Sequence, residues 1–264
     1  MEFVVATNLE EAVSAVAAGA VPLAGGTDLM VGVNSGDRPE SVVGLRRVEE
    51  LREISRSRIG SGARWRVIEK EGPRALAQAA RTVGSPQIRN AGTLGGNVGT
   101  ASPAGDGLPF LAAVDASIEL TSASGTRTIR WDEYFTGVKE TARRPDEIIT
   151  AVVFPDDLPE RQEFAKIGVR NAMVIATVAC VVTRRDDGTT TVALASVAPT
   201  PIRVPEAEEM AGTVTGPNDP GLDEFGRLVA AGVSPITDHR STEEYRRHGA
   251  GVLARRLLAR CLAA

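Results

Sequence analysis

The chain has 264 residues, a formal net charge of -4 and an ordinary mixture of 42% hydrophobic and 24% charged residues, so it can bury a full core in one large or two modest domains. The net negative charge argues against nucleic acid as the main partner. No apolar stretch reaches the length of a membrane span, and the first residues lack the basic start of a signal peptide, which predicts a cytoplasmic protein.

The first third of the chain alternates strands and helices. Thr7 or Asn8 can cap a helix that runs through Ala18, because each has Glu three residues later, and Gly19 provides a stop. The other elements expected before residue 84 are strands at 3–6, 21–23, 41–45 and near 58–59, a short helix around 48–54, and a helix with apolar periodicity over 74–83.

Further along, Ser124 and Gly125 mark the turn of a hairpin. The remaining expected elements are a helix, or an extended approach to one, over 108–114, strands at 117–121, 127–130, 147–154, 164–167 and 190–197, an apolar strand-rich run over 172–182 whose start also suits a helix, a turn at 187–188 and a loop at 217–220. The polar, proline-bounded stretch 155–159 predicts a domain boundary, with domains over 1–158 and 159–264.

A capping box at 241–244 predicts the start of a C-terminal helix. Its expected apolar face carries Tyr245, Val252, Leu257 and Cys261. Its arginines are expected to form a solvated face, with a docking surface for a partner subunit as the alternative: Arg246, Arg247, Arg255, Arg256 and Arg260.

The cysteines and histidines predict no metal site. Cys180 and Cys261 lie far apart, without the paired spacing of a zinc or iron–sulfur site, which favours two small buried hydrophobic residues. His239 and His248 fall in an Arg-rich region that we expect to be exposed.

The most informative segment is QIRNAGTLGGNVGTASPAGD at residues 87–106, which is rich in glycine and carries three hydroxyl side chains, two Asn and a final Asp. Residues 24–28, AGGTD, have the same character. Such runs suggest backbone that bends tightly or approaches a ligand closely, and their N–H and hydroxyl groups suit a polyanionic ligand. A diphosphate or dinucleotide site and mere tight turns remain equally open from composition alone.

Familiar nucleotide motifs are absent from both runs. There is no Gly-x-Gly-x-x-Gly opening a helix and no Gly-x-x-x-x-Gly-Lys-Ser/Thr, so neither a Rossmann fingerprint nor a P-loop is supported. No Ser-His-Asp or Cys-His set is suggested either. Asp28 and Asp106 could form a carboxylate pair, but helix caps or acceptors for ligand hydroxyls are the preferred roles.

The string IRNAGTLGGNVGTASPAGD at 88–106 closely resembles the FAD-binding subunit or domain of molybdenum hydroxylases, the family of xanthine dehydrogenase and carbon monoxide dehydrogenase. AGGTDL at 24–29 matches the other flavin loop of that family, FAKIGVR at 164–170 its lysine-bearing strand, and PITDHRSTEEYRR at 235–247 the stretch that opens its last helix. The resemblance implies an α+β fold, in which an FAD-binding domain of two α/β subdomains precedes a smaller C-terminal α+β domain.

The resemblance also implies a set of cofactor-binding residues. The first loop would face the FAD diphosphate, and any larger residue at Gly25 or Gly26 would block that approach. Asp106 would accept a hydrogen bond from a polar group of the cofactor. Lys166 would lie near the flavin ring, where a cation stabilises anionic reduced flavin. The alternative is a purely structural role, in which Lys166 caps a sheet edge or pairs with a carboxylate. The full set is Leu23, Ala24, Gly25, Gly26, Thr27, Asp28, Leu29, Gly92, Thr93, Gly96, Asn97, Thr100, Gly105, Asp106, Ile148, Ile149 and Lys166.

By resemblance, the chain is the FAD-carrying electron-transfer subunit of a molybdenum hydroxylase. It would pass electrons from iron–sulfur centres through flavin to a terminal acceptor, with a molybdenum–pterin subunit and an iron–sulfur subunit as partners. Catalytic residues are not identified. Two alternatives remain: a stand-alone FAD-dependent oxidoreductase acting on its own small substrate, and a domain that has kept only an assembly role.

Overall fold

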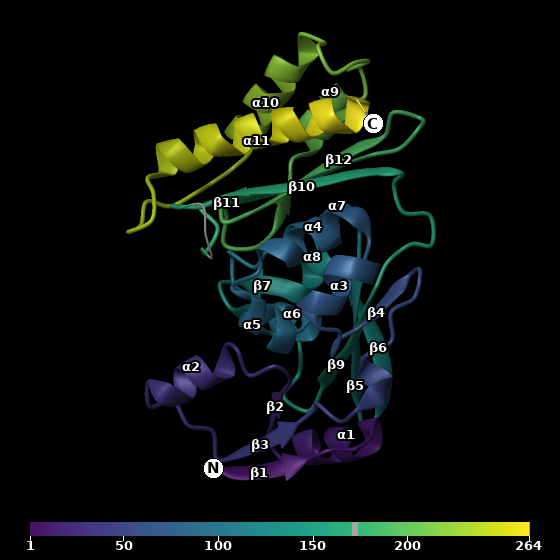
Figure 1. Ribbon diagram of the computed structural model, residues 1–264, viewed down its shortest axis with the longest axis vertical. Coiled ribbons are helices and arrows are strands. Elements are labelled where there is room, and N and C mark those ends of the chain that lie inside the picture. Colours follow the sequence, from purple (N-terminus) through teal and green to yellow (C-terminus); the bar gives the residue numbers. More distant parts are fainter. Residues whose placement is uncertain (171–173, 264) are drawn as a thin grey trace.

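The computed structural model describes residues 1–170 and 174–263, with the N-terminal sheet at one end of the molecule and the C-terminal helices at the other (Figure 1). The first subdomain is a three-stranded parallel sheet in the order β1-β3-β2. Asn8 accepts a hydrogen bond from the Glu11 N–H at the start of its main helix, and Gly19 follows the helix with φ of +95°, so this predicted helix is confirmed. The elements are β1 (Glu2–Val5), α1 (Leu9–Ala17), β2 (Val21–Leu23), α2 (Leu29–Asn34) and β3 (Ser41–Gly44).

The second subdomain is an antiparallel sheet in the order β4-β9-β5-β6 with short helices beside it. The predicted hairpin forms, with Ser122 paired to Gly125. The helix expected over 48–54 shrinks to a single 3₁₀ turn. Its elements are η1 (Glu49–Leu51), β4 (Arg58–Gly60), α3 (Trp65–Glu71), α4 (Arg74–Thr82), α5 (Pro86–Ala91), α6 (Leu94–Thr100), α7 (Leu108–Ala113), β5 (Ser117–Ser122), β6 (Gly125–Arg130), α8 (Trp131–Tyr134), β7 (Phe135–Gly137), β8 (Glu140–Thr141) and β9 (Ile148–Val153).

The glycine-rich segment folds largely into α5 and α6. Glycine disfavours helix, but each helix has a capping side chain. Ser85 accepts a hydrogen bond from the Ile88 N–H, and Thr93 accepts one from the Gly96 N–H. Gly92 separates the two helices with extended backbone. The caps and the packing of each short helix therefore override the low propensity of the sequence.

The C-terminal part is an antiparallel sheet in the order β10-β11-β12-β13. Helices α9, α10 and α11 pack on one side of it, and α4 and α7 of the preceding subdomain pack on the other (Figure 1). The predicted strand-rich run begins as a strand only at Val178, and its residues 172 and 173 lie outside the described residues. The elements are β10 (Arg161–Ile167), β11 (Val178–Arg184), β12 (Thr190–Ala195), β13 (Ile202–Arg203), α9 (Pro205–Ala211), α10 (Gly221–Ala231) and α11 (Glu243–Ala263).

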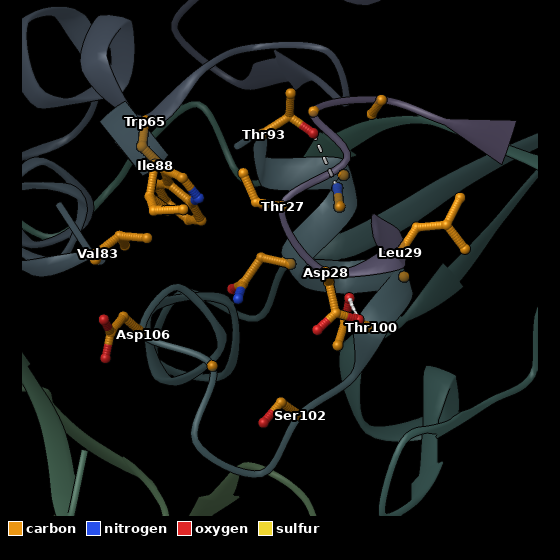
Figure 2. A pocket seen from close by; sticks show the side chains of 18 of the residues that line it. Thr27, Asp28, Leu29, Trp65, Val83, Ile88, Thr93, Thr100, Ser102 and Asp106 are labelled. Carbon is orange, nitrogen blue, oxygen red and sulfur yellow. Dashed lines mark hydrogen bonds between the residues drawn. The ribbon is translucent and has the colours of Figure 1, made fainter. Parts of the chain in front are cut away.

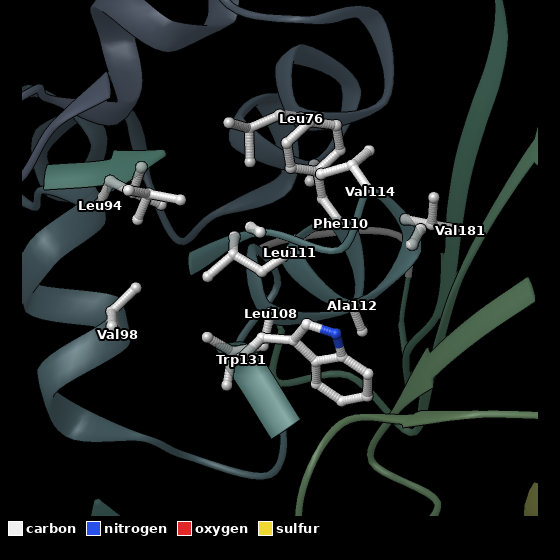
Figure 3. Close-up of a cluster of buried hydrophobic side chains, with 14 of the residues drawn as sticks. Leu76, Leu94, Val98, Leu108, Phe110, Leu111, Ala112, Val114, Trp131 and Val181 are labelled. Atoms are coloured by element: carbon white, nitrogen blue, oxygen red, sulfur yellow. The ribbon is translucent and has the colours of Figure 1, made fainter. Parts of the chain in front are cut away.

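Burial on both faces explains why β11 is almost continuously apolar. Ala179 and Val181 join the core cluster around α7, where Phe110 is fully buried (Figure 3). Cys180 and Val182 join the opposite cluster under α11. A strand covered on both sides has no polar face to alternate with. The C-terminal sheet is thus seated directly on the second subdomain.

The C-terminal helix departs from prediction at three residues. Thr242, one position after Ser241, accepts the capping hydrogen bond from the Tyr245 N–H. Tyr245 is 52% exposed and lies off the buried face. Arg246 is 3% exposed, so the expectation of a solvated arginine is wrong there. Its guanidinium is buried because it donates to two backbone carbonyls and to Asp238.

Candidate functional site

A cavity of about 880 Å³ is lined by both subdomains and by the C-terminal domain (Figure 2). Its size lies toward the upper end of the roughly 300–1,000 Å³ found for small-molecule and cofactor sites. All the residues predicted to hold a cofactor line this cavity except Gly92 and Lys166. The fold therefore brings two glycine-rich segments, nearly 70 positions apart in the sequence, to one place.

The first segment, residues 24–28, is a loop between β2 and α2. Gly26 has φ of +71°, a left-handed conformation that glycine adopts at little cost. Within the described chain, the N–H groups of Gly25, Gly26, Thr27 and Asp28 donate no hydrogen bond. Successive unpaired N–H groups in a turn form an anion-binding nest. This loop therefore has the unpaired backbone donors that a phosphate site needs.

Gly25 lies against the second glycine-rich segment. A Cβ placed on Gly25 would lie 2.1 Å from the carbonyl oxygen of Ala91, at the end of α5. A Cβ on Gly92 would lie 3.3 Å from Thr27 Oγ1. The nearest obstacle to a side chain at Gly25 is thus the protein's own backbone. Gly92 supports the loop from behind, which explains why it does not line the cavity.

The N-terminal turn of α6 has no spare donors. The N–H groups of Leu94 and Gly95 donate to the carbonyls of Ala63 and Ser61. The N–H of Gly96 donates to Thr93 Oγ1. Gly95 is buried for packing, since a Cβ there would lie 2.4 Å from Ser61 Cβ. This segment presents a surface to the cavity without offering a phosphate nest.

Polar side chains tie the two segments together. Thr100 Oγ1 donates to Asp28 Oδ2 across 3.1 Å (Figure 2). Asp28 stands at the N-cap position of α2 but makes no capping hydrogen bond with its side chain, so the expected side-chain cap does not form. Its other expected role, as an acceptor for ligand hydroxyls, stays a prediction. Asn97 accepts from the Gly107 N–H through Oδ1 at 3.3 Å. Its amide nitrogen donates to no described residue, so it is available to a ligand.

Asp106 and Lys166 form a buried pair at the cavity wall. Lys166 Nζ lies 2.6 Å from Asp106 Oδ2 and also donates to the carbonyls of Thr82 and Val174. Burial raises the pKa of Asp106 to about 6, against the opposing effect of Lys166. Asp106 Oδ1 is buried without a hydrogen-bond partner among the described residues. Lys166 therefore does not line the cavity itself but binds Asp106, which does. The Oδ1 oxygen of Asp106 is left without a partner among the described residues.

Sequence reasoning missed two kinds of lining residue. Apolar walls come from residues such as Trp65, Val83 and Ile88, which carry no signal that separates them from core residues. Basic side chains come from loops of both domains and are half-buried or exposed: Arg143, Arg170, His239 and Arg240. His239 was expected to be exposed, and it is, yet it lines the cavity. Two motifs singled out for their resemblance contain three of these residues: 164–170 ends at Arg170, and 235–247 includes His239 and Arg240.

The chemistry of the cavity suits a dinucleotide cofactor. One part of the cavity is lined by unpaired backbone N–H groups, and a second part by the apolar side chains of Trp65, Ile148 and Ile149. A third part is lined by polar groups such as Asn97 and Asp106. A flavin dinucleotide needs this combination of phosphate donors, apolar surface and directed hydrogen bonds. The residues present therefore fit FAD. Among the residues described, no cluster of His, Cys, Asp and Glu could hold a metal ion.

Comparison with known proteins agrees with this assignment. A family model described as "FAD binding domain in molybdopterin dehydrogenase" matches residues 1–157, and one described as "CO dehydrogenase flavoprotein C-terminal domain" matches residues 163–261. The chain therefore belongs to the family of FAD-binding subunits of molybdopterin dehydrogenases.

Individual relatives extend over most of the chain. The putative xanthine dehydrogenase FAD-binding subunit of Escherichia coli (strain K12) is 30% identical over 260 residues, which cover 92% of this chain and 88% of that protein. The nicotinate dehydrogenase FAD-subunit of Eubacterium barkeri is 35% identical over 170 residues, 59% of this chain and 57% of that protein. Reconstituted CO dehydrogenase from Oligotropha carboxidovorans matches in structure with a TM-score of 0.89 and 28% identity, covering 100% of this chain and 98% of that one.

These findings confirm the predicted family, the α+β fold and FAD as the cofactor. They also confirm an oxidoreductase subunit of a molybdenum hydroxylase in preference to a stand-alone flavoprotein. Quinoline 2-oxidoreductase from Pseudomonas putida 86 has the same fold, with a TM-score of 0.91 at 21% identity. None of the described helices combines the length and apolarity needed to cross a membrane.

Proposed function

We propose that the cavity holds FAD with its diphosphate on residues 24–28. The observation that carries this proposal is the run of N–H groups from Gly25 to Asp28, which have no acceptor within the described chain. Two phosphates supply strong acceptors for such a run. The rest of the predicted set then contacts the ribityl chain and the flavin through Asn97, Thr100 and Asp106.

The protein's own residues position the cofactor and exclude water. Ile148 and Ile149 give the cavity an apolar wall, and both are nearly fully buried. Asp106 Oδ1 is the atom free to accept from a polar group of the cofactor, and Lys166 holds the opposite oxygen of that carboxylate. We therefore keep Lys166 in the proposed set as a residue that influences the flavin region by binding Asp106.

The function is electron transfer within a larger complex. FAD bound in this cavity would supply a redox carrier that can take up electrons singly and give them up in pairs. The described part of this chain has no metal-ligand cluster to supply those electrons, so iron–sulfur centres on another subunit are the donors and a molybdenum–pterin subunit carries the substrate chemistry. The names of the relatives, "FAD-binding subunit" and "FAD-subunit", support this arrangement.

Two further assignments complete the proposal. The domain boundary falls at 158/159, in the connection between β9 and β10, supported by family matches that end at 157 and resume at 163. The complex works in the cytoplasm, a proposal supported by Cys180 and Cys261, which are both free thiols. Cell fractionation with an antibody to this chain tests the location, and its recovery from an extracytoplasmic fraction would contradict it.

Cofactor binding is tested by mixing the purified chain with FAD, removing free flavin by gel filtration and recording the visible spectrum. We expect about one flavin per chain. A protein that emerges colourless after excess FAD overturns the proposal. Gly26→Val is the matched variant, because a β-branched side chain at φ of +71° distorts the loop; stoichiometric flavin in that variant would contradict the loop assignment.

Partnership is tested by affinity purification of the tagged chain from its own cells. We expect molybdenum and iron to co-elute with it in two further subunits. A chain that elutes alone and still oxidises a small substrate with bound FAD would contradict the electron-transfer role and support the stand-alone alternative.

A further inference from the structure

The turn between β8 and β9, residues 142–147, brings a cation to the cofactor cavity. Arg143 lines the cavity, and among the described residues it is the one Lys or Arg that the first 158 residues contribute to the lining. The other arginines of the lining, Arg170 and Arg240, belong to the C-terminal domain. Neither the family comparison nor the predicted binding set assigns a role to Arg143.

A buried ion pair shapes this turn. Glu147 is 2% exposed, and its carboxylate binds Arg127 through two contacts, Oε1 to Nε at 2.5 Å and Oε2 to Nη2 at 2.9 Å. Glu147 Oε2 also accepts from the Arg144 N–H at 2.7 Å. Hydrogen bonds from Arg127 hold the pKa of Glu147 below its usual value. The carboxylate thus ties the end of the turn to the N–H of Arg144, and Arg127 holds the other end by donating to the Ala142 carbonyl at 3.0 Å.

The guanidinium of Arg143 is anchored and yet keeps donors to spare. Its Nη1 donates to the Glu147 carbonyl at 2.7 Å and to the Arg144 carbonyl at 3.2 Å. Its Nε and Nη2 donate to nothing within the described residues. Anchoring through one nitrogen reduces the rotamer entropy that binding would otherwise cost. The remaining N–H groups form the planar fork that suits a phosphate.

A chain of contacts connects this turn with the diphosphate loop. Glu147 is followed directly by Ile148 and Ile149, which line the cavity. The Cδ1 of Ile149 lies 3.3 Å from where a Cβ of Gly99 would be, on α6. The next residue of α6, Thr100, donates to Asp28 at the end of the loop.

Charge balance points to the same ligand group. The loop offers neutral N–H groups, and its one charged residue, Asp28, is negative. A diphosphate bound there carries two negative charges that neutral donors compensate only in part. A guanidinium in the same cavity supplies the missing positive charge.

We propose that Arg143 binds the diphosphate of FAD and that Glu147, paired with Arg127, is the positioning residue for it. This inference rests on the proposed FAD site. It adds a binding residue outside both glycine-rich segments and explains why a carboxylate is buried immediately before the two cavity isoleucines.

The test titrates the purified full chain with FAD and with riboflavin, which has no phosphate, and follows flavin fluorescence. Arg143→Gln is expected to weaken FAD binding about tenfold or more, as for a lost hydrogen bond to a charged group, and to leave riboflavin binding unchanged. Arg143→Lys should restore part of the affinity. Arg144→Gln, the exposed neighbour, is the matched control and should bind FAD like the wild type.

Salt dependence gives a second readout, because a phosphate–guanidinium contact is screened by ions. The wild-type affinity for FAD should fall more steeply with sodium chloride than that of Arg143→Gln. Glu147→Gln should weaken FAD binding less than Arg143→Gln, and the double variant should match Arg143→Gln, since coupled residues are not additive.

The outcomes separate the two proposals. A wild-type chain that does not bind FAD refutes the cofactor site itself, and Arg143 with it. A wild-type chain that binds FAD while Arg143→Gln binds it equally well, or loses FAD and riboflavin to the same extent, overturns the role of Arg143 alone. Additive effects of Arg143→Gln and Glu147→Gln would remove Glu147 as the positioning residue.

Discussion

The two glycine-rich segments are similar in sequence but have different roles in the structure. In residues 24–28 four successive N–H groups make no hydrogen bond within the described chain. In α6 the N–H groups of Leu94, Gly95 and Gly96 are all used inside the protein. The first segment therefore has backbone N–H groups that a ligand can use, whereas the second uses its backbone N–H groups for packing and presents side chains such as Asn97 and Thr100 to the cavity.

The glycines of the two segments differ in the same way. Gly26 is needed for its backbone conformation, with φ of +71°. Gly95 has a helical conformation that any residue adopts, and it is needed because Ser61 lies so close. Counting glycines therefore does not identify a binding loop. The useful question is where each N–H group finds its acceptor.

The largest effect on cofactor binding is expected at Gly25. In Gly25→Ala the Cβ meets the Ala91 carbonyl oxygen at 2.1 Å, so the half-buried loop must move and its N–H groups leave their positions. Loss of two hydrogen bonds to charged phosphate, at about 1.5–3 kcal/mol each, corresponds to a more than 100-fold weaker affinity for FAD. Fluorescence titration measures it, with urea unfolding to show that the chain still folds. Wild-type affinity in this variant would remove the distinction between the segments.

The largest effect on stability is expected at Gly95. In Gly95→Ala the new methyl group meets the side chain and carbonyl of Ser61 at 2.4 and 2.8 Å in a buried helix. Overpacking of this kind costs about 1–3 kcal/mol of unfolding free energy. Gly96→Ala is the matched control, because its Cβ has only Thr93 Oγ1 nearby at 3.3 Å, and helix propensity should stabilise it by up to about 1 kcal/mol. Equal unfolding free energies for the two variants in urea would contradict the packing role.

The comparison also shows what the sequence could reveal. The hairpin turn at Ser124 and Gly125 and the cap at Asn8 are local signals, and both elements were predicted. Part of the cavity lining, mainly residues 23–29 and the glycine-rich segment, was predicted through resemblance. Helices α5 and α6 were not, since their glycine content opposes helix and only the caps at Ser85 and Thr93, together with packing, select it.

Long-range placement escaped prediction for a physical reason. Arg143 and Arg240 are ordinary surface residues in sequence, and only the turns that carry them bring them to the cavity. The sequence places Arg246 on a basic helix face, but in the structure its buried guanidinium donates hydrogen bonds to Asp238 and to two backbone carbonyls. Such partners come from distant segments, so no periodicity could indicate them.

Asp106 offers a test that depends on pH. Its pKa of about 6 in the folded protein lies above the ordinary value of 3.8, so between these values the folded state keeps a proton that the unfolded state releases. The stability from this group is present below about pH 4 and is lost as the pH rises through 6. The unfolding free energy of the apo-protein should therefore fall more steeply between pH 4 and 7 in the wild type than in Asp106→Asn. Parallel curves from urea titrations would contradict the raised pKa.

The smallest effect is expected at Thr93, which serves the packing segment and also lines the cavity. Thr93→Val removes the oxygen that accepts the Gly96 N–H and should cost about 1 kcal/mol of unfolding free energy, as for other N-caps. Thr93→Ser keeps the cap and should cost less. The change in FAD affinity should stay well below that of Gly25→Ala, because the freed N–H of Gly96 can itself turn to a ligand. If Thr93→Val weakened FAD binding as much as Gly25→Ala does, α6 would be part of the phosphate-binding surface, and the division of work between the two segments would not hold.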